Sequence, residues 1–373
     1  MKKTLIALAA LASVSAFAQS SVTISGVGDM AIAYNSVADK NTLAAAATIN
    51  KFGTQFGFNN RIQFGVVEDL GGGNAALITS QLRFNPSSGT NEGTAGARPL
   101  FQGESTVGLR SSFGTVKIGR ALTAVQAPNG GTIDPWGVAT VATLPYAAGF
   151  ASSYEAGGEG RIGSAVFYTS PNFSGFSVLF SYGFAKGPTG KVHTAFSGNY
   201  SNGPINAMLG FERNNVNDSL TNLGANYDFG PAKLWAGYGI VKGGSVADRG
   251  ATAWTATASS ALIGGLSNGV ANSGLVANNG TIKSLALGLT APLGAATLKV
   301  GYGRVAGDVI GTVNTNADTK FALGVSYAMS KRTSLYSNLA FITNKKVLDG
   351  NPGIAGTTGA RKTALDMGIA HFF

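Results

Sequence analysis

The chain has 373 residues and a formal net charge of +10, and glycine fills 54 positions, about twice its usual share of roughly 7%. Charged residues make up 12% of the chain, about half of the usual ~25%, while the apolar fraction is an ordinary 44%. A disordered chain would be less apolar and more charged, and the scarcity of charges disfavours a soluble α/β enzyme. Cysteine is absent, which excludes disulfides, thiol catalysis and cysteine-based zinc sites.

Residues 1–18 predict a secretory signal peptide. Lys2-Lys3 gives a positive start, residues 5–14 form a short apolar run, and Ala16-Phe17-Ala18 is a cleavage signal. The apolar run is far shorter than the ~20 residues that a membrane-spanning helix needs. Loss of the two lysines lowers the 27 basic residues to 25 against 17 acidic ones, a formal charge of +8. These charges are scattered singly, so we expect small anions or anionic lipid head groups as partners, and no nucleic acid.

Apolar residues alternate with small or polar ones through much of the remaining chain. Near the C-terminus, Leu365, Met367 and Ile369 alternate with Ala364 and Asp366. Successive side chains of a β-strand point to opposite faces, so such a segment has one apolar face and one small or polar face. The pattern predicts sixteen strands, near 22–34, 61–69, 74–84, 104–110, 114–120, 161–168, 176–184, 193–200, 205–214, 220–229, 232–241, 281–291, 295–305, 318–329, 334–342 and 362–373.

The connections between these strands alternate in length. Short ones such as Ser201-Asn202-Gly203-Pro204 and Pro292-Leu293-Gly294 are rich in the residues that tight turns require. A soluble β-sandwich gives no reason for short turns at one end and long loops at the other, whereas a barrel inserted into a membrane from one side does. We therefore predict that residues 19–373 form an all-β fold, a 16-stranded antiparallel up-and-down transmembrane β-barrel with short periplasmic turns and long extracellular loops. The long connections include 35–60, 85–103, 121–160, 242–280 and 343–361.

A barrel of sixteen strands leaves a water-filled channel unless something plugs it. The connection 121–160 is large enough to fold inward as a constriction loop, and its charged residues are all acidic. Basic residues of the wall strands would face this loop across the channel. Charges of one sign that line a pore favour ions of the opposite sign. The alternative for the arginines of the wall strands is that they lie at the barrel rim, where they would be solvated or paired with lipopolysaccharide phosphates. The basic wall of the constriction is predicted to comprise Arg61, Arg83, Arg110, Lys117, Arg120 and Arg161, and the acidic side Glu104, Asp134, Glu155 and Glu159.

Strand alternation assigns directions to several basic residues. Arg83, Arg110 and Lys117 each fall on the face opposite the large apolar residues of their strands, so we expect them to point into the lumen. Arg120 is out of phase with Lys117, and it can point inward only if its strand ends or bulges there. Because the basic wall outnumbers the loop acids, we expect a weak preference for anions.

Five segments, together with the signal peptide, carry a family resemblance. In this order they resemble the general porins of Gram-negative β-proteobacteria, of the neisserial and comamonad type, over the whole length of the chain. The resemblance implies a homotrimer of 16-stranded barrels, each with a pore narrowed by its third long loop. It also implies that Phe373 is an assembly signal, read by the barrel-assembly machinery. The segments are Ser21-Val22-Thr23-Ile24-Ser25-Gly26-Val27-Gly28-Asp29, Glu68-Asp69-Leu70-Gly71-Gly72-Gly73, Phe113-Gly114-Thr115-Val116-Lys117-Ile118-Gly119-Arg120, Tyr168-Thr169-Ser170-Pro171-Asn172-Phe173-Ser174-Gly175-Phe176 and Gly368-Ile369-Ala370-His371-Phe372-Phe373.

The resemblance places the family's pore arginines on Arg61, Arg120 and Arg161. This chain departs from relatives at two places. It has Gly103-Glu104 where some relatives carry basic residues, which weakens anion preference. It has Gln81, two residues before an arginine, where many relatives carry a lumenal glutamate, which strengthens that preference.

An outer-membrane enzyme is the first competing function. A barrel hydrolase needs a nucleophile, a histidine base and an orienting group within reach of one another. Of the two histidines, His193 opens a strand and His371 lies on the expected lipid face, and we interpret both as membrane-interface residues. No spacing of side chains predicts a metal site and no cofactor is expected, so we predict that the chain is not an enzyme.

Two further alternatives concern the lumen. The loops at 121–160 and 242–280 could plug the barrel, which would then act as an adhesin or a structural protein. A substrate-specific anion channel is the other alternative, and a ladder of aromatic residues in the lumen would favour it. The preferred prediction is an outer-membrane general diffusion porin, a channel for passive passage of ions and small hydrophilic solutes, surrounded by outer-membrane lipid and lipopolysaccharide.

Overall fold

The computed structural model describes residues 20–38, 48–55, 60–91, 99–137, 140–144, 146–147, 160–184, 192–215, 217–243, 263–264, 280–307, 318–343 and 361–373. The predicted signal peptide, residues 1–18, lies outside the described residues. Among the described residues, no helix is long and apolar enough to cross a membrane. In chain order the elements are β1 (Ser21–Ala38), β2 (Thr48–Gln55), β3 (Arg61–Gly71), β4 (Asn74–Asn85), β5 (Thr90–Asn91), β6 (Glu104–Ser111), β7 (Gly114–Leu122), α2 (Gln126–Ile133), β8 (Tyr146–Ala147), β9 (Arg161–Thr169), β10 (Phe176–Gly183), β11 (His193–Asn202), β12 (Ile205–Arg213), β13 (Ser219–Asp228), β14 (Lys233–Lys242), β15 (Ile263–Gly264), β16 (Thr281–Leu293), β17 (Ala296–Gly307), β18 (Asp318–Ala328), β19 (Thr333–Thr343) and β20 (Arg361–Phe372).

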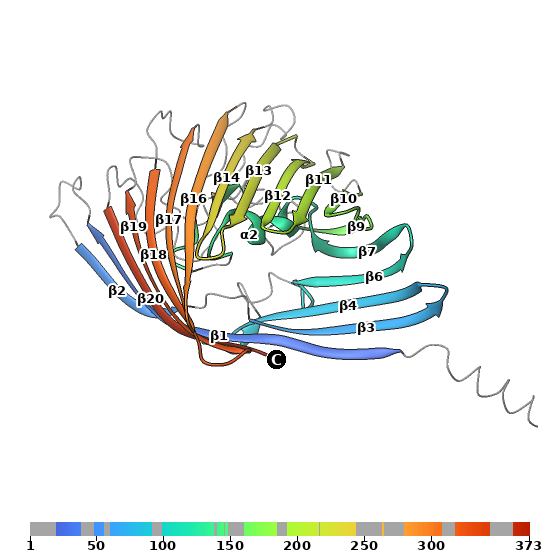
Figure 1. Ribbon diagram of the computed structural model, residues 1–373, viewed down its shortest axis with the longest axis horizontal. Coiled ribbons are helices and arrows are strands. Elements are labelled where there is room, and N and C mark those ends of the chain that lie inside the picture. Colours follow the sequence, from blue (N-terminus) through green and yellow to red (C-terminus); the bar gives the residue numbers. More distant parts are fainter. Residues whose placement is uncertain are drawn as a thin grey trace, which may run out of the picture.

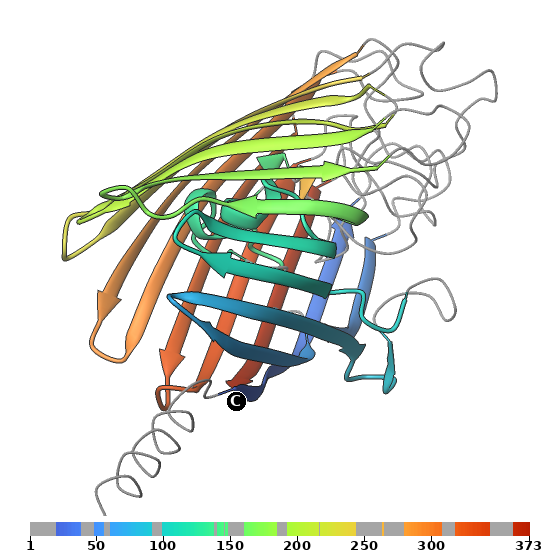
Figure 2. The ribbon, with the colours of Figure 1, turned by 90° about the vertical axis from the view of Figure 1, so that its right-hand side faces the viewer.

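Eighteen of the twenty described strands form one closed antiparallel barrel, and β8 and β15 pair separately with each other (Figures 1 and 2). Wall strands that follow one another in the chain are paired, and β1 closes the ring by pairing with β20 on one edge and with β3 on the other. Along that second edge, β2 pairs with residues 31–38 of β1 and β3 with residues 21–27. β2 and β3 therefore form successive parts of a single wall strand. β5 is a two-residue addition that pairs with the end of β4. The 18-stranded sheet thus corresponds to the sixteen wall strands that the sequence predicts.

The limits of the sixteen predicted strands lie within four residues of those observed, whereas β2 and the two-residue strands β5, β8 and β15 lie within predicted connections. The sequence assigns residues 35–60 to a connection, whereas β2 lies within them, so this assignment was wrong. Asn50 and Gly53 have low strand propensity, and the strand forms there because the extended end of β1 offers a backbone edge to pair with. The short turns between strands gather at the end of the barrel where the C-terminus lies (Figure 2).

Alternation along each strand gives the wall an apolar outer face and a polar or small inner face. On β13, Leu223 is 56% exposed on the outside, while Asn222 on the opposite face is fully buried. On β20, Met367 is exposed on the outside, while Ala364 and Asp366 are buried inside, as the alternation predicts. Closure of the ring also pairs the backbone of every wall strand on both edges, which a hydrocarbon surrounding requires.

Candidate functional site: the inner loop and the basic wall

The described part of the connection between β7 and β9, which we call loop 3, lies inside the barrel. Its helix α2 packs against the inner faces of β12, β13 and β14 (Figure 1). After α2 the loop continues along the inner wall as far as β20, where Val141 N donates to Asp366 Oδ2 at 2.9 Å. The inward fold predicted for residues 121–160 is therefore confirmed for the described residues 123–137 and 140–144.

The root of loop 3 is fastened to three strands by buried hydrogen bonds. Thr123 Oγ1 donates to Glu212 Oε2 on β12 at 2.8 Å. Ala124 N donates to Ser181 Oγ on β10 at 3.1 Å, and the carbonyl of Ala124 accepts from Ser197 Oγ on β11 at 2.7 Å. Each of the three wall side chains is fully buried. Moving the root would leave buried polar groups unsatisfied at about 1–3 kcal/mol each, so this end of the loop is fixed.

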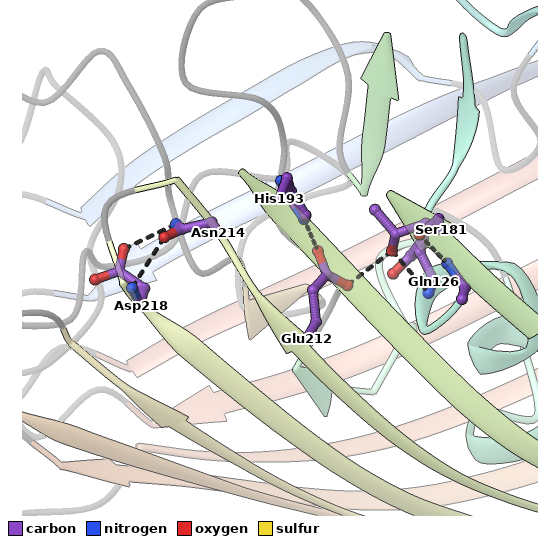
Figure 3. A network of polar contacts seen from close by, with 8 residues as sticks. Gln126, Ser181, His193, Glu212, Asn214 and Asp218 are labelled. Atoms are coloured by element: carbon purple, nitrogen blue, oxygen red, sulfur yellow. Dashed lines mark hydrogen bonds and ion pairs between the residues drawn. The ribbon is translucent and has the colours of Figure 1, made fainter. Parts of the chain in front are cut away.

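Figure 3 shows this polar network around Glu212. Its Oε1 also contacts His193 Nε2 at 2.7 Å, and both side chains are buried. Further along, Asn214 and Asp218 bond to each other across the connection between β12 and β13. The interpretation of His193 as a membrane-interface residue was therefore wrong. Its partner lies on the next strand, and nothing in the local sequence of β11 indicates a carboxylate there.

The later part of loop 3 is held by polar side chains from β17, β18 and β19. Lys299 and Lys320 donate through Nζ to two carbonyl groups of the loop, at 3.0 and 2.7 Å. Asn338 Oδ1 accepts from the indole Nε1 of Trp136 at 2.8 Å. Because these contacts come from successive strands, they fix the course of the loop along the wall as well as its distance from the wall.

A row of glycines on six successive wall strands lets loop 3 approach the wall closely. A Cβ atom at Gly224 or at Gly237 would overlap the side chain of Ile133. A Cβ atom at Gly301 would lie 2.7 Å from Trp136 Cζ3, closer than packed carbon atoms come. Side chains of the loop thus fill the space that wall side chains would otherwise occupy. The six glycines, which we call the glycine seat, are Gly210, Gly224, Gly237, Gly288, Gly301 and Gly324.

Asp134 follows α2 and is only 1% exposed. Its Oδ1 accepts from Trp136 N at 3.1 Å, and its Oδ2 accepts from Leu144 N at 3.3 Å, so the carboxyl group joins two parts of the loop. Burial raises the pKa of Asp134 to about 7, although these hydrogen bonds and the charges of Lys299 and Lys320 act in the opposite direction.

We expect Asp134 to make the folding stability depend on pH. Its pKa is higher in the folded chain than the ordinary 3.8, so between about pH 4 and 7 the folded state holds one more proton and stability falls as the pH rises. Between pH 5 and pH 8 this amounts to roughly 3 kcal/mol. Asp134→Asn lacks this contribution, so the wild type should lose stability relative to the variant over that interval. Urea unfolding from lipid vesicles at both pH values measures the difference, and an equal difference at both would contradict the expectation.

Four arginines gather at the loop ends of neighbouring strands. Arg61 on β3 and Arg83 on β4 are direct cross-strand partners. Arg120 on β7 and Arg161 on β9 donate through Nε to the carbonyl groups of two adjacent residues just before β6, at 3.1 and 2.8 Å. The structure therefore brings four of the six predicted basic-wall residues into one region of the barrel.

The strand irregularity on which the direction of Arg120 depends is present. The pairing of β7 with β9 shifts between Gly119 and Ala121. Gly119 has φ +136°, a backbone conformation that side chains rarely allow. Across the shift two residue steps of β7 face three of β9, so the extra residue lies on β9, where Ser164 has φ +46°. Arg120 is 8% exposed, and its Nε donates to the segment before β6.

The other predicted site residues take different positions. Glu104 lies on the same wall as the arginines, where its Oε1 accepts from Lys117 Nζ and from Thr106 Oγ1, both at 2.9 Å. Arg110 is exposed beside the turn between β6 and β7, at the end of the barrel away from the arginine group. Two members of the predicted acidic side lie outside the described residues: Glu155 and Glu159.

The C-terminal residue is built into the wall. The backbone of Phe373 exchanges two hydrogen bonds with Gly26 of β1, at 2.9 and 3.1 Å. The Phe373 ring lies where a side chain at position 26 would be, and it remains 47% exposed. His371 is exposed near the same end, with its Nδ1 2.9 Å from Thr333 Oγ1.

Comparison with known proteins agrees with this architecture. Residues 4–347 match the Gram-negative porin family. Outer membrane porins of Bordetella pertussis and of Delftia acidovorans are each 30% identical to the chain, with 100% of both chains covered. Among solved structures, the anion-selective porin from Comamonas acidovorans has a TM-score of 0.69 and 26% identity, covering 95% of this chain and 100% of that one. OmpT of Vibrio cholerae, 12% identical over 95% of this chain and 98% of its own, shares the fold with a TM-score of 0.59.

These likenesses extend over the whole barrel rather than over one motif. They account for the closed 16-stranded wall, for its apolar outer face and for the loop that folds inside. They also decide between the channel and the enzyme that the sequence left as competing functions. The chain belongs to the Gram-negative porin family and is an outer-membrane porin, not an enzyme.

Proposed function

We propose that this porin is a weakly anion-selective diffusion channel for ions and small hydrophilic solutes, and that the basic wall sets its selectivity. The observation that carries the proposal is the local excess of charge. Among the described residues at this level of strands β3 to β9, Lys117 and the four gathered arginines carry five positive charges and Glu104 carries one negative charge, an excess of +4. The solved porin from Comamonas acidovorans, 26% identical to this chain, is anion-selective, which supports the same sign here.

Burial supports a place in the lumen rather than at the rim. Arg83, Arg120 and Arg161 are each 8% exposed, whereas a solvated rim arginine would be largely exposed. On the acidic side, Asp134 is buried within loop 3, and burial favours its neutral form. We therefore propose that the field in the constriction comes mainly from the basic wall.

A substrate-specific channel has less support. Three aromatic side chains face inward on the described strands, Phe167 on β9, Trp235 on β14 and Tyr336 on β19, and at least three wall strands separate each from the next. Tyr336 donates its hydroxyl to Asp29 Oδ1 at 2.6 Å, so it is held against the wall. Such widely separated aromatic residues do not make a ladder along which a solute could move.

Assembly follows from the family resemblance. We propose a homotrimer in outer-membrane lipid and lipopolysaccharide, exported by the signal peptide of residues 1–18. OmpT of Vibrio cholerae has been solved in a trimer form. We also propose that Phe373, exposed at the end of the last strand, is read by the barrel-assembly machinery.

Single-channel recording tests the proposal. The refolded protein is reconstituted in a planar bilayer, and the current and the reversal potential are measured across a KCl gradient. We expect stepwise conductance with a reversal potential displaced toward that of chloride. A reversal potential on the potassium side would contradict the assignment of the basic wall. Silence from folded barrels would instead support the plugged lumen of an adhesin or structural barrel.

A further inference from the structure

Two uncharged residues before β6 lie at the centre of the arginine group. Arg120 Nε donates to the carbonyl of Gln102 at 3.1 Å, and Arg161 Nε donates to the carbonyl of Gly103 at 2.8 Å. Gln102 is 1% exposed, and Gly103 is also buried. One dipeptide therefore holds two guanidinium groups that arrive from two different strands.

The same dipeptide is joined to a third arginine through a chain of amides. Arg83 Nε donates to Gln81 Oε1 at 3.1 Å, and Gln81 Nε2 donates to Gln63 Oε1 at 2.7 Å. The backbone N of Gly103 donates to the carbonyl of Gln81 at 3.1 Å. The amide side chain on β4 thus fixes the direction of Arg83 and is itself held from both sides.

Glycine is required at position 103 for this arrangement. A Cβ atom there would overlap Gln81 Oε1 and would lie 2.6 Å from Gln81 Cδ. The amide that accepts from Arg83 occupies the space of the missing side chain. An alanine at position 103 would have to displace the amide, and with it the acceptor of Arg83.

We propose that Gln102, Gly103 and Gln81 are positioning residues of the selectivity filter, which set the degree of anion preference without carrying charge. This inference rests on the proposed function of the basic wall. A guanidinium held through Nε keeps a fixed place and direction, and its effect on a passing ion falls with distance. Loss of the acceptor lets the arginine move along the wall or toward the bulk solution, and the number of charges stays the same.

The test measures selectivity in variants that leave the net charge unchanged. In Gly103→Ala we expect the anion-to-cation permeability ratio to fall by up to about sixfold, the change for one guanidinium that withdraws from about 4 to about 8 Å in water, where anion and cation respond with opposite sign. In Gln81→Met, which keeps the volume and removes the acceptor, we expect a smaller fall. Gly65→Ala is the matched control, because Gly65 lies on the inner face of β3 and its nearest neighbour, the carbonyl of Thr23, is 4.0 Å away.

The outcomes separate this inference from the proposed function. A wild type without anion preference would overturn the proposed function itself. If the wild type prefers anions and removal of arginines shifts it, but Gly103→Ala and Gln81→Met match the wild type, then positioning by these residues is disproved and the basic wall stands. A change in conductance without a change in the reversal potential would also overturn the inference, because it would show an effect on pore shape alone. Should Gly103→Ala fail to fold, Gln81→Met still decides.

Discussion

Replacing Arg61 and Arg161 together by glutamine is expected to move the reversal potential of the channel toward that of the cation. Each guanidinium changes the energy of an ion about 4 Å away by about 1 kcal/mol in water. The sign is opposite for chloride and potassium, so each charge contributes up to about 2 kcal/mol, or roughly thirtyfold, to the anion-to-cation permeability ratio, and loss of both charges lowers that ratio. The effect should be large at 0.1 M KCl, where the Debye length is ~10 Å, and small at 1 M, where it is ~3 Å.

Arg110→Gln provides the control for this experiment. It removes one positive charge, half of the change in the double variant, from the inner register of the wall, but Arg110 is exposed beside the turn between β6 and β7. We expect its reversal potential to match the wild type within a small fraction of the shift seen in the double variant. A shift about half as large as that of the double variant would mean that the net charge of the whole lumen sets selectivity. No shift in the double variant would place Arg61 and Arg161 outside the constriction.

The wall of the barrel can be predicted from the sequence because each strand carries its own signal. Period-two alternation and turn residues are local properties, so the sixteen strands and the order of short and long connections follow without any knowledge of distant contacts. The direction of Lys117 follows from the same alternation. Even Arg120, which is out of phase, can be assigned on condition of an irregularity, and the pairing of β7 with β9 does shift beside it, next to a glycine with φ +136°.

The contacts of loop 3 cannot be predicted in this way because they depend on closure of the ring. Trp136 and Asn338 are 202 positions apart in the chain, and Val141 and Asp366 are 225 apart, yet each pair shares a hydrogen bond. No local pattern indicates which strands a loop will meet after the barrel closes. One signal was available, since glycines at inward positions of successive strands leave a surface that another segment must fill.

Charge type alone also says little about partners. Glu104 was placed on the acidic side because it is acidic, but its neighbours in the folded wall are Lys117 and Thr106. Asp134 was placed in the lumen because it belongs to the inner loop, but it bonds two amides of that loop. Periodicity gives the face from which a side chain starts, and the packed structure decides where its charged end lies.

Adding side chains to the glycine seat is expected to push loop 3 into the lumen and to lower the single-channel conductance. Cβ atoms at Gly224 and Gly237 would overlap Ile133, while packed carbon atoms need about 3.5–4.0 Å. The wall cannot yield, because β13 and β14 are each paired along both edges. In Gly224→Ala/Gly237→Ala we therefore expect α2 to move inward by more than about 1 Å, at a cost in stability of about 1–3 kcal/mol.

Ile133→Ala should rescue the double variant. On its own it removes the side chain between the two glycines and leaves a cavity, at a cost of about 2–5 kcal/mol. Combined with the two alanines, the new methyl groups occupy the vacated space, so conductance and stability should both return toward the wild type. Such non-additivity is the signature of direct contact. If the triple variant conducts as poorly as the double variant, the narrowing does not arise from contact with Ile133.

The two experiments should also separate pore size from ion preference, because the structure places them on different strands. The glycine seat lies on β12 to β18, whereas the gathered arginines lie on β3, β4, β7 and β9. Alanines in the seat change no charge and do not contact the arginine group, so they should lower conductance while the reversal potential stays near the wild-type value. Neutral substitutions in the basic wall should shift the reversal potential at low salt while the conductance stays near the wild-type value. A seat variant that shifted the reversal potential as strongly as Arg61→Gln/Arg161→Gln would show that loop 3 and the basic wall act as one element, with aperture and selectivity coupled.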